Sequence, residues 1–363
     1  MTWNWQHAAW PEFRFDLTAT ESLEREFLLK SGSLLGASSH LSDEDRDQIR
    51  VQLLSDEALL TSRIEGEMLD RDSLQSSLQR QLGLKEDHRK VSPAERGISE
   101  LLIDGYRRFD EPLNAARLLE WHAMLMQGRR DIEVGAFRSD GDPMQVVSGP
   151  IHDPRVHFEA PPAVRVPDEI QGFFAWWNHD GAKLPCLARA SIAHLYFESI
   201  HPFDDGNGRI GRALSELAVS QSLGQPVILS LSKVIDSNRS AYYDELARAN
   251  RRLDVDRWIS YFSTTILQAH DLSLKSVEFL IAKTRFFGRF QEPLNPRQEK
   301  VLLRMFREGL DGFKGGLSSS NYRAIAKTTT ATATRDLSAL VELGALRRTG
   351  ERKHARYHLH LER

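Results

Sequence analysis

The sequence contains a single cysteine, Cys186, in 363 residues, which excludes both an internal disulfide and a cysteine metal cluster. It has no uninterrupted apolar run long enough to span a bilayer, and its first residues lack the basic and apolar regions of a secretory signal. From these absences we expect a cytoplasmic protein with no membrane partner. The formal net charge is only −3, which by itself indicates no particular class of partner.

The charge is unevenly distributed along the chain. Residues 297–363 hold 14 Lys/Arg and 7 Asp/Glu, so the C-terminal segment carries +7 and the remainder carries −10. This asymmetry marks the C-terminal segment as a separate unit. We therefore expect a C-terminal domain at 290–363, distinct from an N-terminal helical region and a central domain.

Helical periodicity dominates the N-terminal region and the central domain. We expect helices at 20–37, 42–65, 92–109, 114–127, 167–179, 184–200, 207–222, 239–250 and 254–270. Residues 139–166 are instead rich in glycine, proline and β-branched residues, which predicts one hairpin with an irregular tip. Aromatic residues precede the first helix and are expected to pin the N-terminal segment onto the helical body: Trp3, Trp5, Trp10, Phe13 and Phe15. The fold class is therefore mainly α.

The most informative stretch reads His-Pro-Phe-Asp-Asp-Gly-Asn-Gly-Arg-Ile-Gly-Arg and runs from 201 to 212. Gly206 and Gly208 allow a tight turn in which backbone N–H groups converge on an anion. A helix that starts near Asn207 adds its N-terminal amides and its dipole to the same anion site. On that helix Arg209 and Arg212 share one face, so they can bind phosphate oxygens together.

Two further residues of this stretch suit the chemistry of phosphate groups. Asp205 is a hard oxygen ligand for Mg²⁺ on the same phosphates, and His201 can accept a proton near neutral pH. A base, a metal ligand, an anion-binding turn and two arginines together predict phosphoryl or nucleotidyl transfer. A single His-Pro-Phe or Gly-x-Gly is more often an ordinary turn, but a chance match to all eight fixed identities has a frequency on the order of one in ten billion per position.

The stretch resembles the motif of the Fic family, His-x-Phe-x-(Asp/Glu)-Gly-Asn-Gly-Arg-x-x-Arg, and it matches every fixed position. The resemblance covers about residues 95–285, which implies a catalytic core over these residues and an N-terminal helical region at 1–94. It also implies that the core is a helical bundle with a β-hairpin flap. Family members usually transfer AMP from ATP to a Ser, Thr or Tyr hydroxyl of a target protein. The resemblance implies ATP and Mg²⁺ as cofactors, His201 as the catalytic base and Asp205 as the metal ligand. The nucleotide phosphates would lie against Gly206, Asn207, Gly208, Arg209, Gly211 and Arg212.

The flap of the family holds the target segment beside the nucleotide. Val147, Ser148 and Gly149 occupy the matching stretch here. An exposed strand edge would accept an extended target peptide through backbone hydrogen bonds. A hairpin with a purely structural role is the alternative.

The segment that begins at Arg239 resembles the nucleoside pocket of the family. Tyr242, Tyr243 and Asn250 are its candidate adenine contacts, because an aromatic ring can stack on a base while an amide hydrogen-bonds it. Tyr243 and Asn250 are seven residues apart, so they can face one side of a helix. Adjacent tyrosines are otherwise ordinary core or surface residues.

A second motif lies far upstream, at Thr61-Ser-Arg-Ile-Glu65-Gly66. Taken alone, it reads as the polar end of a helix followed by a glycine. Beside the first motif it resembles the inhibitory motif of the Fic family, (Ser/Thr)-x-x-x-Glu-(Gly/Asn). The resemblance implies that Glu65 pairs with Arg212, which otherwise orients the γ-phosphate, so that the protein is autoinhibited.

The C-terminal segment has its own pattern. A helix at 297–308, a helix-turn-helix over 321–343 and a two-stranded wing over 344–359 resemble a winged helix, a common companion of this class of Fic protein. Candidate DNA contacts are Thr329, Thr330, Thr332, Thr334, Arg335, Arg347, Arg348, Arg352, Lys353 and Arg356. A dimerisation or target-docking module with a solvated basic face is the alternative.

Two classes of function follow from these patterns. The first is a protein adenylyltransferase that modifies target proteins and itself. The second is a DNA-binding regulator whose Fic body senses nucleotides, for which His201 would not be needed. Transfer of UMP or phosphocholine, or removal of AMP, remains open within the enzyme class. The sequence does not identify the target protein, and it leaves open whether the protein forms a homodimer.

Overall fold

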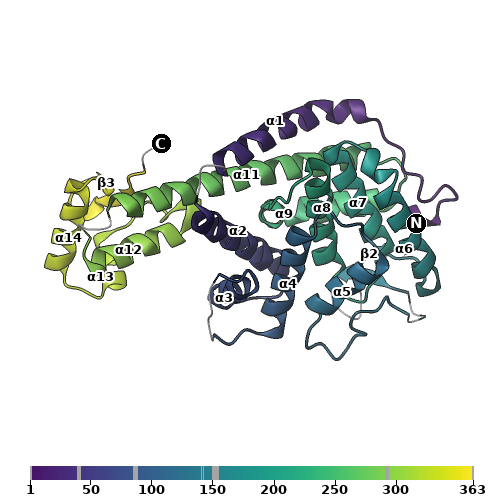
Figure 1. The fold of residues 1–363 in the computed structure, drawn as a ribbon, viewed down its shortest axis with the longest axis horizontal. Coiled ribbons are helices and arrows are strands. Elements are labelled where there is room, and N and C mark those ends of the chain that lie inside the picture. The colour runs from purple at the N-terminus through teal and green to yellow at the C-terminus, as the bar shows by residue number, and fades with distance from the viewer. Residues whose placement is uncertain are drawn as a thin grey trace. The chain divides into compact units, whose positions relative to one another are not determined.

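The computed structural model describes residues 2–38, 42–84, 89–139, 141, 143–148, 155–290 and 294–361. It is mainly helical, as the sequence predicts (Figure 1). The chain divides into two compact units, residues 1–36 with 50–273 and residues 37–49 with 274–363. No helix among the described residues has the length and apolar character needed to cross a bilayer.

The helices of the first unit follow one another along the chain, with one long connection between α5 and α6 that contains the hairpin. They are α1 (Glu21–Ser38), α2 (Asp43–Ile64), α3 (Arg71–Gln81), α4 (Pro93–Arg107), α5 (Ala115–Leu125), α6 (Val166–Asn178), α7 (Cys186–Ile200), α8 (Asn207–Leu223), α9 (Leu231–Ser237), α10 (Arg239–Ala249) and α11 (Asp256–Arg289). The ends of α1 and α11 and the start of α2 belong to the second unit.

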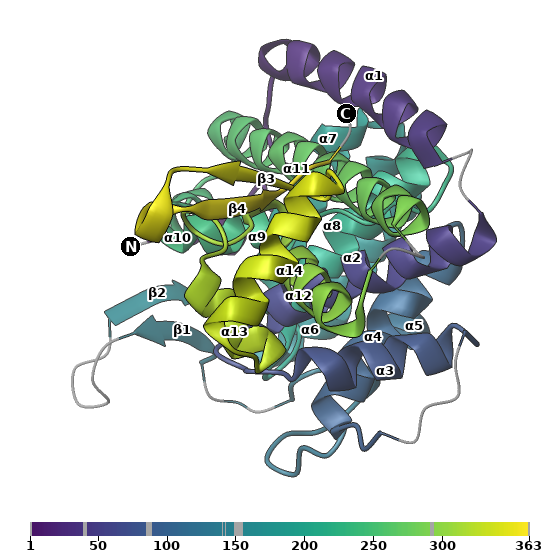
Figure 2. The same cartoon turned by 90° about the vertical axis from the view of Figure 1, so that its left-hand side faces the viewer.

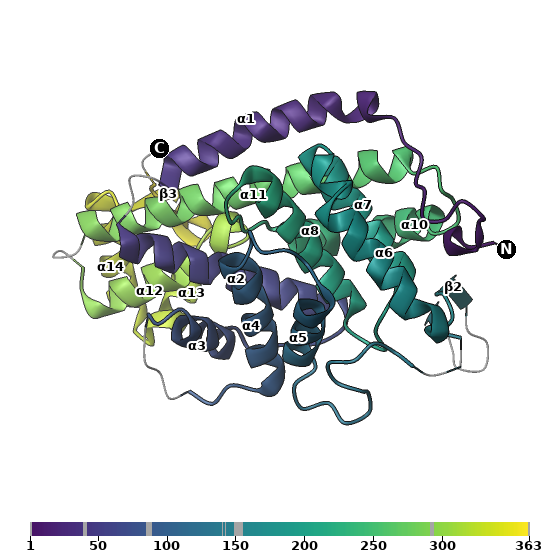
Figure 3. The same cartoon turned by 45° about the vertical axis from the view of Figure 1, so that its right-hand side comes forward.

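The core of the first unit surrounds α7, every residue of which is buried. Helix α8 lies beside α7 (Figure 3), and large side chains such as Trp121, Trp177 and Trp258 fill the space around the pair. The helix is enclosed on every side, and its polar side chains Arg189, His194 and Glu198 are buried along with the apolar ones. The end of α7 is therefore held rigidly, which matters because His201 follows it.

One hairpin interrupts the helices. Strand β1 (Gln145–Ser148) pairs antiparallel with β2 (Arg155–Glu159), and the register shifts between Val146 and Val147. The predicted hairpin is thus confirmed. Gly149, one of the predicted flap residues, lies outside the described residues.

The N-terminal aromatic residues pack as predicted. The Trp3 ring meets Phe158 of β2 edge-on at 5.4 Å, and the Trp10 ring meets Tyr196 of α7 at 5.3 Å. The indole of Trp5 donates a hydrogen bond to the carbonyl of Glu159 at 2.7 Å. The segment before α1 therefore braces the base of the hairpin as well as α7.

The second unit contains α12 (Pro296–Arg307), α13 (Ser319–Ala326) and α14 (Thr330–Glu342), followed by β3 (Leu346–Thr349) and β4 (Arg356–Leu359). The two strands pair antiparallel beside α14 (Figure 2). Tyr322, Leu337, Leu340 and Tyr357 are buried in their shared core. The order of these elements agrees with the order expected from the sequence.

The structure differs from the predicted helices at three places. Helices α3 and α9 were missed, and α11 continues to Arg289 instead of ending near 270. Helix α3 was missed because only Leu74 and Leu78 among its 11 residues are buried apolar side chains, so its sequence shows almost no periodicity. Helix α9 has only seven residues, too few for a periodic pattern.

Candidate functional site

The candidate site lies where α7 ends and α8 begins. His201 caps α7 with a backbone φ of 50°, and its N–H donates to the carbonyl of Phe197 at 3.0 Å. Gly206, with φ of 87°, precedes the first turn of α8. Positive φ is uncommon for a residue other than glycine, although histidine is among the more frequent exceptions. The conformation of His201 must therefore be held by its surroundings.

Arg138 supplies that restraint. Its side chain is buried, and its Nε donates to the carbonyl of His201 at 2.7 Å. Its backbone N–H donates to the carbonyl of Pro202 at 3.0 Å, and its Nη2 donates to that of Ile200 at 3.3 Å. One buried guanidinium residue thus fixes three consecutive carbonyl groups. Sequence reasoning missed this role, because Arg138 lies 63 residues away and in no motif.

Asn207 and Phe203 lock the loop between the two helices. The amide of Asn207 accepts from the Phe203 N–H at 3.0 Å and donates to the Phe203 carbonyl at 2.7 Å. The ring of Phe203 stacks on His122 with 4.1 Å between centroids. The side chain of Asn207 is therefore engaged within the loop, which leaves its backbone N–H as the group that faces an anion.

The N-terminus of α8 has the properties of an anion site. No side chain caps it, and the first N–H groups of a helix have no carbonyl partner within the helix. A Cβ atom at Gly208 would overlap Oε1 of Glu65. The Glu65 carboxylate, just beyond the end of α2, thus already lies against this helix terminus, and the missing side chain of Gly208 makes that approach possible.

The segment after α2 delivers that carboxylate. Helix α2 ends at Ile64, and Gly66 turns the chain with φ of 83°. Arg63 pairs with Asp236 of α9, which ties the end of α2 to α9. Glu65 and Glu67 then both contact α8.

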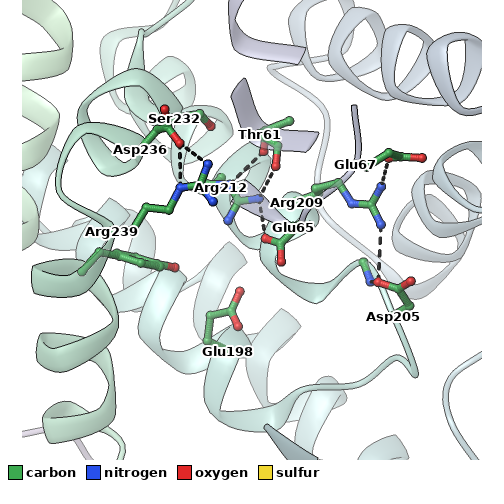
Figure 4. A network of polar contacts seen from close by, with 12 residues as sticks. Thr61, Glu65, Glu67, Glu198, Asp205, Arg209, Arg212, Ser232, Asp236 and Arg239 are labelled. Carbon is green, nitrogen blue, oxygen red and sulfur yellow. Dashed lines mark hydrogen bonds and ion pairs between the residues drawn. The ribbon is translucent and has the colours of Figure 1, made fainter. Parts of the chain in front are cut away.

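Arg212 is enclosed by the predicted upstream motif (Figure 4). Its Nε donates to Oγ1 of Thr61 at 2.8 Å, and its Nη2 donates to the Thr61 carbonyl at 3.0 Å and to Oε1 of Glu65 at 2.7 Å. Arg212 is 2% exposed, so its charge has little access to water. The negative charge of Glu65 raises the pKa of the Arg212 guanidinium against the opposing effect of burial.

Arg209 is engaged in the same way by a residue that sequence reasoning missed. Its Nη1 donates to Oε2 of Glu67 at 2.7 Å, and its Nη2 lies 3.4 Å from Oδ1 of Asp205. Asp205 in turn accepts from Nη1 of Arg129 at 2.7 Å and from the Gly206 N–H at 2.6 Å. Burial of Asp205 opposes its ionisation, but Arg129 and Arg209 hold its pKa below the usual range.

His201 lies deep in the site. Its side chain is 12% exposed, and its Nδ1 is 3.8 Å from Oε2 of Glu198. Burial lowers the pKa of His201 to about 4, and the charge of Arg138 acts in the same direction. The imidazole is therefore unprotonated at neutral pH, as a base must be.

The hairpin lies beside this histidine. The ring centroid of Phe158 on β2 is 6.5 Å from that of His201, and Val147 on β1 is 50% exposed. Ser148 is the last residue of β1. The sheet consists of β1 and β2, with no third strand among the described residues.

The predicted adenine contacts are only partly brought together. The hydroxyl of Tyr242 is buried against Nε2 of His194 at 2.7 Å. The amide oxygen of Asn250 accepts from Ser199 at 3.1 Å, inside the core. Tyr243 is 42% exposed, and partial burial and the charge of Glu65 raise its pKa to about 12 against the opposing charge of Arg212. Tyr243 is thus the member of this set that lies at the surface near the arginines.

Comparisons with known proteins agree with this geometry. Residues 112–219 match the Fic/DOC family, and residues 3–84 match a domain of unknown function, DUF4172. The chain is 31% identical over 175 residues to the probable protein adenylyltransferase of Aquifex aeolicus, which covers 46% of this chain and 49% of that protein. It is 26% identical over 165 residues to protein adenylyltransferase fic-1 of Caenorhabditis elegans. This match covers 45% of this chain and 29% of that protein. The chain thus spans half or less of these relatives.

Solved structures show the same fold. A Fic family protein from Desulfovibrio desulfuricans aligns over 96% of this chain and 98% of its own, with a TM-score of 0.56 and 21% identity. A Fic domain containing signaling protein from Bacteroides thetaiotaomicron aligns over 70% of this chain and 97% of its own, with a TM-score of 0.52 and 20% identity. The buried α7, the loop and the start of α8 together with these matches lead to one conclusion: the chain carries a Fic/DOC family domain.

Proposed function

We propose that this protein transfers AMP from ATP to a Ser, Thr or Tyr hydroxyl of target proteins. The observation that carries the proposal is the position of the Glu65 carboxylate. This anion accepts a hydrogen bond from Arg212 and lies against the start of α8, where Gly208 has no side chain to obstruct it. A site that binds one anion in this way suits the phosphates of a nucleotide. An unprotonated imidazole, that of His201, ends the helix beside it.

Asp205 fits the role of a magnesium ligand. Its carboxylate is 37% exposed and must release Arg129 to bind a metal. The described residues contain no group of three or more His, Cys, Asp or Glu that would hold an ion alone. Mg²⁺ bound mainly by phosphates and water, with one carboxylate from the protein, suits this donor set. When bound, the ion neutralises charge on the α- and β-phosphates.

The residues of the chain then have distinct roles in the reaction. His201 takes the proton of the target hydroxyl, whose oxygen forms a bond to the α-phosphorus as the bond to the bridging oxygen of pyrophosphate breaks. The N–H groups at Asn207 and Gly208, and that of Gly206 once Asp205 releases it, stabilise charge on the phosphate oxygens, and Arg209 and Arg212 hold the leaving group. Gly211 permits the close approach of α7 to α8. The open edge of the hairpin at Val147 and Ser148 suits an extended target segment.

In this proposal the described conformation is the inhibited one. Arg212 is committed to Thr61 and Glu65, and Arg209 is committed to Glu67. ATP that binds in this conformation cannot use the two arginines to orient its phosphates. Its α-phosphorus is therefore out of line for attack by the target hydroxyl. Activity requires that the segment 61–67 move away from α8.

The position of a transferred label tests the function. We expect Glu65→Gly protein to modify itself when incubated with ATP labelled at the α-phosphate and to remain unlabelled with ATP labelled at the γ-phosphate. The reason is that attack at the α-phosphorus releases both outer phosphates. Gel autoradiography reads the result without knowledge of the target. Transfer of the γ-label, or labelling from UTP in preference to ATP, contradicts the proposal.

As a second candidate function we propose that the C-terminal unit binds DNA. The observation in its favour is the charge of the surface of α14 and the strands that follow. Asp336, the acidic residue in the first half of α14, is 5% exposed and accepts hydrogen bonds from Arg297 at 3.1 Å and Tyr322 at 3.0 Å. Exposed basic residues lie in or directly after α13, in α14, in β3 and between the two strands: Arg323, Lys327, Arg335, Arg347, Arg348 and Arg352. A helix whose first half exposes no acidic residue, with arginines on the elements beside it, suits a DNA groove.

Substitution of Arg335 tests DNA binding. We expect the full-length protein to bind a short labelled duplex in low salt and Arg335→Ala to weaken that binding about 10-fold, because one arginine contact to DNA is lost. Fluorescence anisotropy over a salt series measures both affinity and salt dependence. Arg25→Ala, at an exposed arginine of α1, is the matched control and should bind like the unmodified protein. Equal loss in both variants, or no binding in low salt, contradicts a DNA interface.

A further inference from the structure

Two buried polar atoms near the proposed base are unsatisfied. Among the described residues, neither Nδ1 of His201 nor Oε1 of Glu198 has a hydrogen-bond partner. The two side chains lie one turn apart at the end of α7, with Nδ1 3.8 Å from Oε2 of Glu198. A buried polar group without a partner is costly, and a small rotation of either side chain would join these two. Contacts of this kind are often long before substrate binds and shorten afterwards.

The structure makes specific room for the Glu198 carboxyl group. A Cβ atom at Gly211 would lie only 2.6 Å from its Oε1, so any other residue at 211 would displace it. The carboxyl group also has no place in the proposed reaction so far, although it lies 3.8 Å from Nδ1 of His201 and the charge of Arg212 acts on it. A buried carboxyl that only filled space would be replaced at lower cost by an apolar side chain.

We propose that Glu198 is the positioning residue of His201: its carboxylate accepts the Nδ1–H proton and leaves the lone pair of the imidazole on Nε2. This inference rests on the proposed function of His201 as a base. An imidazole has one donor and one acceptor nitrogen, so the partner of Nδ1 decides whether Nε2 can take a proton. The carboxylate also stabilises the imidazolium that forms when His201 accepts the hydroxyl proton.

The protonation state of Glu198 then controls the base. Burial raises the pKa of Glu198 to about 8, the charge of Glu65 acts in the same direction and that of Arg212 opposes it. Tyr242 and Tyr243 of α10 also face the group, and His194 borders it across Gly211. Below this pKa the neutral carboxyl can donate its own O–H to Nδ1. The ring proton then resides on Nε2, and the base is lost.

The ¹⁵N resonances of the imidazole test this directly. In histidine-labelled protein without ATP, we expect the His201 ring to change from the Nε2–H to the Nδ1–H tautomer as the pH rises through about 8. The change should vanish in Glu198→Gln, which cannot titrate. In Glu65→Gly its midpoint should move to lower pH, because the negative charge that raises the pKa of Glu198 is gone. A His201 tautomer that does not respond to pH in the unmodified protein overturns the proposal.

Two controls separate a positioning role from a structural one. The His122 resonance reports the stacked loop and should be unchanged in Glu198→Gln. Glu169→Gln removes another buried carboxylate, on α6, and should leave the His201 tautomer as it is. If the tautomer of His201 shifts equally in Glu169→Gln, the effect is global and the inference is wrong.

Kinetics separate this inference from the proposed function. In the Glu65→Gly background we expect Glu198→Gln to lower kcat for AMP transfer about 10²-fold and to abolish its rise with pH, with KM for ATP unchanged. Equal kcat–pH profiles with and without Glu198→Gln overturn the inference while leaving AMP transfer intact. Absence of transfer in Glu65→Gly protein instead overturns the proposed function, and the tautomer measurement still decides whether Glu198 holds Nδ1.

Discussion

Glu65→Gly is expected to raise the rate of AMP transfer by about 10- to 100-fold over the unmodified protein. The substitution removes the carboxylate that binds Nη2 of Arg212 at 2.7 Å. A hydrogen bond to a charged group contributes about 1.5–3 kcal/mol, and 1.36 kcal/mol corresponds to a tenfold change in rate. The freed Arg212 remains buried, so the phosphates of ATP become its best available partner. Incorporation of α-labelled nucleotide per minute measures the effect.

The companion variants give a graded series. Glu65→Gln keeps the shape of the side chain but loses its charge, so its rate should fall between those of the unmodified protein and Glu65→Gly. Glu67→Gln should raise the rate by less than about fivefold, because the Glu67 side chain is 36% exposed and solvent weakens its pair with Arg209. Glu12→Gln, at an exposed acid before α1, is the matched control and should have no effect. An unchanged or lower rate for Glu65→Gly, with thermal stability and ATP affinity intact, contradicts autoinhibition.

The loop and the start of α8 could be predicted from sequence because the relevant interactions are local. Gly206 must adopt a positive φ and α8 must begin directly after it, and both follow from residues within a few positions. The contact between Glu65 and Arg212 joins residues 147 positions apart. No pattern of spacing links such residues, and only the resemblance to the Fic family paired them. From its own residues, the segment 61–66 predicts no more than the end of a helix.

The residues that sequence reasoning missed share one property: each acts through a contact that no motif contains. Arg138 and Arg129 reach the loop from a long connection, and Glu67 reaches Arg209 from beyond the end of α2. Glu198 lies close to His201 in sequence, but on a helix whose residues are all buried it reads as one more core position. Asn250 differs from these residues, because the sequence singled it out. It was expected to contact the adenine, whereas its side chain lies within the core beside Ser199. Tertiary packing, which periodicity does not describe, decides all of these positions.

Loss of the imidazole of His201 is expected to abolish AMP transfer and to preserve the binding of ATP. In the Glu65→Gly background, His201→Ala should lower kcat by about 10²- to 10⁴-fold, the usual contribution of a general base. ATP affinity should remain measurable by calorimetry, because the N-terminus of α8 and Arg212 bind phosphates without His201. The backbone at 201 has φ of 50°, where asparagine is tolerated better than alanine. His201→Asn is therefore the variant that removes the base with the least disturbance of the loop.

The outcome of the two substitutions distinguishes chemistry from architecture. If His201 acts as the base, both variants lose transfer to the same extent, although only alanine is expected to lower thermal stability through backbone strain. If the residue only caps α7, His201→Asn retains transfer and His201→Ala loses it together with stability. His179→Ala, at an exposed histidine just after α6, is the control and should change neither quantity. Transfer at the unmodified rate in His201→Asn would therefore refute the role of His201 as the base, whatever the alanine variant does.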